Sequence, residues 1–421
     1  MAIVLGIVAA VLAVALVAAF LIVPNILKPK DVRGYVSGKT YVNRFFELQH
    51  ELPDTFAFAS KSELDSLFTA SVDIARELDI KVDEKKAEKQ VIFDAMEYNP
   101  INGDIVFVAV SPLSIPSSID DDELMDTLSD GILQSGEAFK ATDVKQEKQR
   151  LSIGESEYPA SLITMKIHDT KVEMYAALIR KDDHVAVLAA RSITAGRPKE
   201  LLEGFTNDLE NAPEPPKTDE SDDDADASTT EYSHGTTSGS TYTSECLGFA
   251  LKLPNDFVFE DVSAVDDQLQ KTMEELSGDS GLLNSSSANA FIPEIHAELA
   301  ASNKKTGEVA LGLSFTVPKS YSDTYDGTQI ATNFIDQIPE DTLRKSMEAA
   351  GASNVKIEHH TCKIGDKDVP YLFETYQIAG ISFSQGQIVL AHDNYVTLLQ
   401  LVTFDSTPSR FEEIAKGITM L

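Results

Sequence analysis

The chain has 421 residues, of which 43% are hydrophobic and 24% are charged, and its formal net charge is −33. This length exceeds one ordinary core, because domains of roughly 150 residues are typical, and the composition excludes a chain that is disordered along most of its length. The acidic excess argues against a nucleic-acid partner, because phosphate binding requires clustered Lys and Arg.

The N-terminal region has the pattern of a membrane anchor. Residues 2–23 contain no charged side chain, and a helix of this length, at about 1.5 Å per residue, crosses the hydrocarbon core of a bilayer. The apolar run is longer than that of a cleavable signal peptide, and no basic stretch precedes it. We therefore expect a transmembrane helix at 2–23, which would place the protein at a membrane, and a juxtamembrane segment at 24–35.

Two parts of the chain repeat the same residues at one fixed distance. Seven residues of the first part recur 201 positions later, including the string Leu-Pro-x-x-Phe-x-Phe. The pairs are Gly38 and Gly239, Thr40 and Thr241, Tyr41 and Tyr242, Leu52 and Leu253, Pro53 and Pro254, Phe56 and Phe257, and Phe58 and Phe259. A fixed offset of this kind indicates a duplicated domain. We expect one repeat at 36–210 and the other at 239–421.

The residues between the repeats differ in composition. Three prolines and a run of Asp and Glu are followed by Ser, Thr and Gly between positions 211 and 238. Such a segment cannot bury enough apolar surface to offset the loss of chain entropy. The sequence therefore predicts a disordered acidic linker at 211–238.

The first half of each repeat predicts strands, a helix and a hairpin in the same order. Ser60 and Glu63 form a capping box at the start of an apolar helical stripe, and Ser263 and Asp266 form a weaker box in the second repeat. A hairpin follows, with its turn at 102–104 in the first copy.

The second half of each repeat is duplicated as well. The string Ile-Gly-x-x-x-x-Pro begins at Ile153 and again at Ile364, and it is typical of a tight turn between strands. A long hairpin and a helix that opens at Pro198 or Pro408 complete each copy. Both repeats therefore predict the order ββαββαβββα, an α+β fold in which a twisted antiparallel sheet packs against helices.

These motifs resemble the PsbP-like fold. The opening Tyr-x(10)-Leu-Pro-x-x-Phe, the central hairpin, the Ile-Gly-x-x-x-x-Pro step and the closing hairpin with its helix carry the resemblance in both repeats. The same fold includes bacterial DcrB-like lipoproteins. The resemblance implies a non-enzymatic binding or assembly role, and it transfers no site residues because the fold hosts unrelated functions.

Two signals disagree about the side of the membrane. Lys28, Lys30 and Arg33 follow the apolar run and favour a cytoplasmic C-terminal portion. The Ser/Thr-rich acidic linker and the lipoprotein resemblance favour the outside, and we expect the soluble domains to be extracytoplasmic. Protease treatment of intact cells tests this, because a surviving full-length chain would place the domains inside.

The chain has two cysteines, Cys246 and Cys362, both in the second repeat. Two cysteines make neither a disulfide framework nor a zinc cluster. Two interpretations stay open at this point: buried free thiols, or a Cys246–Cys362 disulfide formed in an oxidising compartment.

Metal-ligand residue types crowd together in the string Glu358-His359-His360-x-Cys362. Because side chains alternate along a strand, Glu358, His360 and Cys362 would share one face. No complementary pair of ligands is visible nearby, so these three are weak metal candidates, and we expect no cofactor.

The residues that the repeats share include no catalytic motif. The string Gly-Asp-Ser-Gly at 278–281 resembles the nucleophile string of trypsin-like proteases, but it lies in an insertion absent from the first repeat. We therefore expect a membrane-anchored, non-catalytic binding or scaffolding protein with a protein or small-ligand partner. The alternative is a metal-dependent hydrolase centred near His360 and Cys362.

Overall fold

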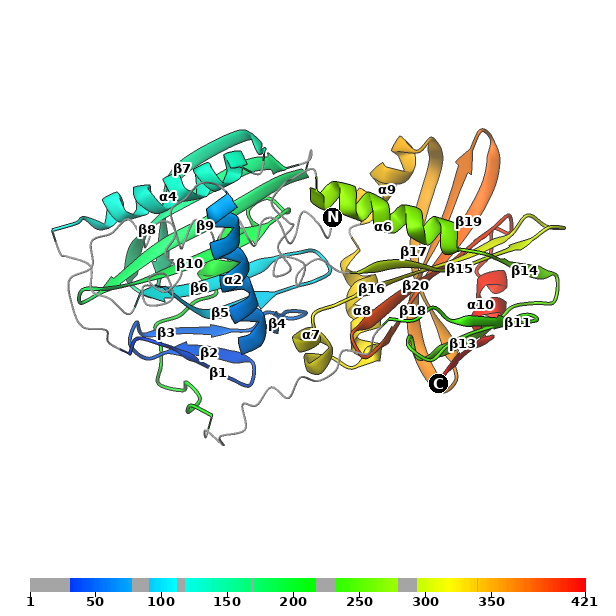
Figure 1. Ribbon diagram of the computed structural model, residues 1–421, viewed down its shortest axis with the longest axis horizontal. Coiled ribbons are helices and arrows are strands. Elements are labelled where there is room, and N and C mark those ends of the chain that lie inside the picture. Colours follow the sequence, from blue (N-terminus) through cyan, green and yellow to red (C-terminus); the bar gives the residue numbers. More distant parts are fainter. Residues whose placement is uncertain are drawn as a thin grey trace. The chain divides into compact units, whose positions relative to one another are not determined.

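The computed structural model describes residues 31–77, 91–111, 118–138, 140–167, 170–216, 232–278, 294–338 and 340–421. The predicted transmembrane helix at 2–23, residues 217–231 of the predicted linker and most of the Gly-Asp-Ser-Gly string lie outside the described residues. At the end of the predicted linker, residues 236–238 form a strand instead, β11 (Thr236–Ser238). Within the described residues, no helix has both the length and the hydropathy that crossing a bilayer requires. The chain divides into two compact units (Figure 1). We call residues 31–216 the N-terminal unit, and residues 232–274 with 294–421 the C-terminal unit.

The N-terminal unit contains two antiparallel sheets. The small sheet has the strand order β1-β2-β3, and the large sheet has the order β4-β5-β6-β10-β9-β8-β7. Its elements are β1 (Tyr35–Ser37), β2 (Thr40–Asn43), β3 (Leu48–Glu51), β4 (Ala57–Phe58), α2 (Lys61–Glu77), β5 (Ile92–Tyr98), β6 (Ile105–Ser111), α4 (Asp121–Ala138), β7 (Thr142–Ile153), β8 (Ser156–Ile167), β9 (Thr170–Lys181), β10 (His184–Ser192) and α5 (Arg197–Glu203).

The C-terminal unit repeats this architecture with additions. Its small sheet has the order β11-β12-β13-β21, and its large sheet has the order β14-β15-β16-β20-β19-β18-β17. Its elements are β11 (Thr236–Ser238), β12 (Thr241–Ser244), β13 (Phe249–Lys252), β14 (Phe257–Glu260), α6 (Ser263–Gly278), β15 (Ile295–Asn303), β16 (Val309–Thr316), α7 (Lys319–Thr324), α8 (Gly327–Gln337), α9 (Glu340–Ala349), β17 (Ala352–Ile364), β18 (Lys367–Ile378), β19 (Ile381–His392), β20 (Tyr395–Thr403), α10 (Ser409–Ala415) and β21 (Ile418–Met420).

Each unit has its own apolar core. In the N-terminal unit, Tyr41 of the small sheet and Leu201 of α5 are buried in one cluster with residues of the large sheet. In the C-terminal unit, Tyr242 of the small sheet and Phe411 of α10 are likewise buried in one cluster with residues of the large sheet. Helix α4 packs against β7, β8 and β9, whereas α8 and α9 pack against β17, β18 and β19. The predicted mixed α+β class, with large antiparallel sheets packed against helices, is confirmed.

The predicted order ββαββαβββα is incomplete at two places in both units, and a further strand, β21, follows the last helix of the C-terminal unit. Four strands, not two, precede the first helix of each unit, because Gly38 and Gly239 adopt a φ of 60° and turn the chain into an additional hairpin. A meander of four strands, not three, follows the second helical region. The outermost strand of this meander is β7 in the N-terminal unit and β17 in the C-terminal unit. Many side chains of both strands are exposed, so these strands lack the apolar pattern of a buried strand.

One of the two predicted capping boxes is present. The Ser60 N–H donates to Glu63 Oε2 at 2.6 Å, and the Glu63 N–H donates to Ser60 Oγ at 3.2 Å. The box predicted from Ser263 and Asp266 was wrong. Helix α6 begins at Ser263, and the Ser263 N–H donates to Asp261 Oδ1 at 2.9 Å. Since Asp261 serves the helix terminus, the carboxylate of Asp266 is available for other contacts.

Candidate metal centre

The metal candidates predicted from the sequence lie on β17 but do not converge. Glu358 is exposed, the ring of His360 stacks on Tyr371 with centroids 5.4 Å apart, and Cys362 is buried in the core. Alternate residues of a strand are about 6.6 Å apart, so three of them in a row cannot surround one ion without ligands from elsewhere. His360 Nε2 lies 3.9 Å from Glu358 Oε2, but in the described part of the chain the three side chains together do not form a group of neighbouring ligand atoms.

The two cysteines are free thiols. Cys246 and Cys362 are buried in the same core cluster and form no disulfide. Burial raises the pKa of Cys362 to about 11, and the nearby Glu412 carboxylate acts in the same direction. Of the two interpretations left open by the sequence, the structure supports the buried thiols.

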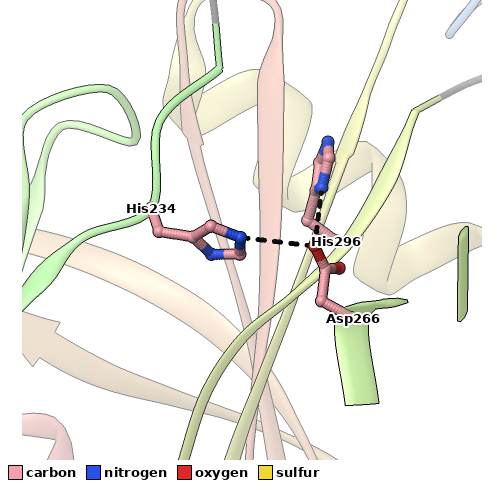
Figure 2. A group of neighbouring side chains, drawn as sticks. All are labelled: His234, Asp266 and His296. Atoms are coloured by element: carbon pink, nitrogen blue, oxygen red, sulfur yellow. Dashed lines mark hydrogen bonds and ion pairs between the residues drawn. The ribbon is translucent and has the colours of Figure 1, made fainter. Parts of the chain in front are cut away.

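A different group of ligand-type side chains comes together near the start of β15. His234 Nε2 lies 3.2 Å from Asp266 Oδ2, and His296 Nδ1 lies 3.4 Å from the same oxygen. The three ligand atoms lie within 4.8 Å of one another. Figure 2 shows both imidazole rings directed at this carboxylate. The side chain of His234 is 45% exposed, whereas those of His296 and Asp266 are 14% and 11% exposed, so solvent reaches the cluster from the His234 side.

Three separate segments supply this cluster. His234 precedes β11, Asp266 lies in the first turn of α6, and His296 is the second residue of β15. The Ala297 N–H donates to Asp266 Oδ1 at 2.8 Å, which leaves Oδ2 facing the two imidazoles. The sheet itself therefore fixes the orientation of the central carboxylate.

The β-bulge beside the cluster, with its carboxylate and the glycine N–H bonded to it, is present in both units and is called the frame of the cluster. A β-bulge interrupts the register at Asp94 in β5 and at Glu298 in β15. Gly34 N–H donates to the Asp94 carboxylate at 2.8 Å, and Gly235 N–H donates to the Glu298 carboxylate at 3.0 Å. Bulges commonly re-aim a side chain, and here each bulge turns a carboxylate towards the segment that precedes the first strand. This bond holds the segment with His234 beside β15.

The two histidine ligands are not duplicated. Arg33 and Ile92 occupy the positions in the N-terminal unit that correspond to His234 and His296. No local sequence motif marks this cluster. The signal that could have revealed it is the presence of histidine in one copy only, at two positions beside a frame that both copies share.

Tyr232 links the cluster to the buried bulge carboxylate. Its ring stacks on that of His296, with centroids 3.6 Å apart and an interplanar angle of 6°. The Tyr232 hydroxyl donates to Glu298 Oε2 and lies 3.0 Å from His234 Nδ1. Burial, reinforced by the hydrogen bond to Glu298, raises the pKa of Tyr232 well above its usual value, so the phenol stays protonated. His296 Nε2, the ring nitrogen that does not face Asp266, lies 3.9 Å from Glu294 Oε2.

The donor set suits a divalent ion of the Zn²⁺ type. Two imidazoles and one carboxylate match the ligands of zinc and similar first-row ions, whereas Ca²⁺ and Mg²⁺ prefer oxygen ligands alone. Ligands at about 2.0–2.1 Å from a tetrahedral zinc ion lie about 3.3–3.4 Å from one another. The two separations around Asp266 Oδ2, 3.2 and 3.4 Å, match that spacing, and the two imidazole nitrogens lie within 4.8 Å of each other. Three protein ligands leave a fourth position for water or an exogenous ligand.

Comparison with known proteins gives distant structural similarities alone. No family model matches the chain, and no curated protein matches it significantly. A protein of Bacteroides thetaiotaomicron is 12% identical over 44% of this chain with a TM-score of 0.23, and the match spans about half (49%) of that protein. Cyanobacterial PsbP (CyanoP) from Synechocystis is 12% identical over 46% of this chain and 99% of its own length, with a TM-score of 0.27. The type VI secretion immunity protein TplEi of Pseudomonas aeruginosa is 8% identical over 92% of this chain and 96% of its own, with a TM-score of 0.21.

The PsbP similarity agrees with the PsbP-like resemblance found in the sequence. All three TM-scores are below 0.5, so the similarities carry no argument about function.

Proposed function

We propose that this chain is a non-catalytic binding protein of two PsbP-like units, and that its C-terminal unit binds one divalent transition-metal ion of the Zn²⁺ type. His234, Asp266 and His296 are the ligands. The observation that carries this proposal is the approach of two imidazole nitrogens, at 3.2 and 3.4 Å, to one oxygen of a carboxylate whose other oxygen is held by the backbone.

A binding role is favoured over catalysis by what the two units share. Both keep the bulge carboxylates Asp94 and Glu298 and the glycine N–H groups that they hold, which are structural features. The hydrolase alternative near His360 and Cys362 lacks support, because in the described part of the chain the three candidate side chains do not converge. The membrane anchor and the extracytoplasmic location stay predictions.

Isothermal titration of zinc chloride into the purified chain tests the proposal. An excess of Mg²⁺ is included, because a chain with a net charge of −33 attracts divalent ions loosely over its surface. We expect one zinc ion per chain. Asp266→Asn and His296→Ala should each weaken binding by more than the roughly 10- to 100-fold that is typical for the loss of an outer-shell partner.

The matched control is His360→Ala, which removes the metal candidate predicted from the sequence. This variant should bind zinc as tightly as the unaltered chain. The proposal fails if the unaltered chain shows no saturable binding at one ion per chain, or if His360→Ala loses affinity while Asp266→Asn keeps it.

A further inference from the structure

We infer that Tyr232 is a positioning residue for the metal centre. Its hydroxyl links the buried Glu298 carboxylate to His234 by hydrogen bonds, and these bonds determine which ring nitrogen of His234 binds the metal. The inference rests on the proposed function, because it explains how one ligand of that site is oriented. It concerns a hydrogen-bonded chain of three side chains, Glu298–Tyr232–His234.

The hydrogen bonds of Glu298 determine the direction of this chain. Its side chain is fully buried, and Oε1 accepts the Gly235 N–H at 3.0 Å. Oε2 accepts the hydroxyl proton of Tyr232. The single proton of the phenol is thereby committed to the carboxylate, so towards His234 the phenol oxygen acts as an acceptor.

The consequence for His234 concerns its tautomer. Nδ1 lies 3.0 Å from the phenol oxygen of Tyr232, which accepts, so Nδ1 carries a proton. The ligand atom is then Nε2, which lies 3.2 Å from Asp266 Oδ2. A metal-bound histidine almost always donates its other ring N–H to a carboxylate, carbonyl or water, which fixes the ring and raises its basicity. Here the phenol of Tyr232 transmits that effect from a carboxylate that lies 3.9 Å from Nδ1.

The second histidine shows a looser version of the same arrangement. His296 offers Nδ1 to the cluster, and its Nε2 lies 3.9 Å from the exposed carboxylate of Glu294. Both imidazoles therefore have a carboxylate on the side away from Asp266. The two differ in burial, because the side chain of Glu298 is 0% exposed and that of Glu294 is 66% exposed. The stronger orienting effect is thus assigned to Glu298 and Tyr232.

Zinc titration of Tyr232→Phe tests the inference. This substitution keeps the ring that stacks on His296 and removes the hydroxyl alone. We expect the dissociation constant for zinc to rise about 10- to 100-fold. Glu298→Gln, which keeps an acceptor for the phenol but removes the charge, should give a smaller rise and serves as the second variant if Tyr232→Phe folds poorly.

Tyr41→Phe is the matched control. The Tyr41 hydroxyl donates to Asp94 at 2.5 Å, so this variant loses the same type of phenol–carboxylate bond in the unit that lacks counterparts of His234 and His296. Its zinc affinity should equal that of the unaltered chain, although its N-terminal unit should be less stable.

Nitrogen-15 NMR of the metal-free chain provides a readout that does not depend on metal. We expect a ring N–H signal of His234 that exchanges slowly with water, that disappears in His234→Ala and that is lost in Tyr232→Phe. Unchanged zinc affinity in Tyr232→Phe overturns the inference. If the unaltered chain binds no zinc, the proposed function fails, and the absence of the protected N–H signal then overturns the hydrogen-bonded chain as well.

Discussion

Individual side chains account for a marked difference between the two cores. His50 and Glu97 form a buried pair in the N-terminal unit, with both side chains 2% exposed and His50 Nδ1 2.7 Å from Glu97 Oε1. Burial raises the pKa of Glu97, while the hydrogen bond and charge of His50 act in the opposite direction. The C-terminal unit has Leu251 and Ala301 at the equivalent positions. The duplicated fold therefore accepts either a polar or an apolar pair at this place.

This difference gives a prediction for stability. Glu97→Ala leaves His50 buried without its carboxylate and should lower the free energy of unfolding by about 3–5 kcal/mol. The double variant His50→Leu/Glu97→Ala reproduces the pair of the C-terminal unit, and it should be more stable than the single variant because buried ion pairs often exchange for apolar pairs at little cost. Hydrogen exchange of β3 and β5 as a function of denaturant measures both.

Asp122→Ala is the control for that experiment, since it breaks the exposed ion pair with Arg150 at 3.0 Å. Its effect should stay below about 1 kcal/mol. A double variant no more stable than Glu97→Ala would contradict the interpretation that the core tolerates both pairs.

At the scale of elements, the β-bulges are the features that connect sheet and segment. The bulge residue Asp94 accepts hydrogen bonds from Gly34 N–H, from the Tyr41 hydroxyl and from Asn43 Nδ2. These bonds tie β5 of the large sheet to β2 of the small sheet and to the segment before β1. In the C-terminal unit, the bulge residue Glu298 accepts the corresponding hydrogen bond from Gly235 N–H and a second one from the Tyr232 hydroxyl.

Asp94→Asn tests the structural role of a bulge carboxylate. An amide offers one acceptor oxygen and places an NH₂ group opposite donors, so the substitution should cost about 1–3 kcal/mol. Hydrogen exchange at residues 31–36 should become faster. The control is Glu157→Gln, a substitution at an exposed residue of β8. If residues 31–36 exchange at the same rate in both variants, the bulge carboxylate does not hold this segment.

At the scale of the whole molecule, duplication explains why much of the fold could be predicted. The repeated residues are turn and core positions: Gly38 and Gly239 both have a positive φ, and Tyr41 and Tyr242 are both buried. Patterns of this kind depend on local periodicity and backbone conformation, which sequence reveals directly. The number of strands in the closing meander was predicted less well, because the outer strands β7 and β17 have many exposed side chains and little apolar alternation.

The candidate site could not be predicted in the same way. His234, Asp266 and His296 belong to three separate segments, so no short motif marks them. Asp266 has the sequence context of a helix-capping residue, and its contact with the Ala297 N–H depends on the packing of α6 near β15. The string around His360 is crowded in sequence, but its side chains are spread along one strand. Metal ligands converge through tertiary structure, which local spacing does not report.

The central claim is that the C-terminal unit holds one metal ion between these three residues. Its most direct test is X-ray diffraction from crystals of the zinc-loaded chain, recorded on both sides of the zinc absorption edge. We predict one strong anomalous peak at about 2.0–2.2 Å from His234 Nε2, His296 Nδ1 and Asp266 Oδ2. An anomalous peak beside Glu358 and His360, or no peak at the three ligands, would contradict the claim.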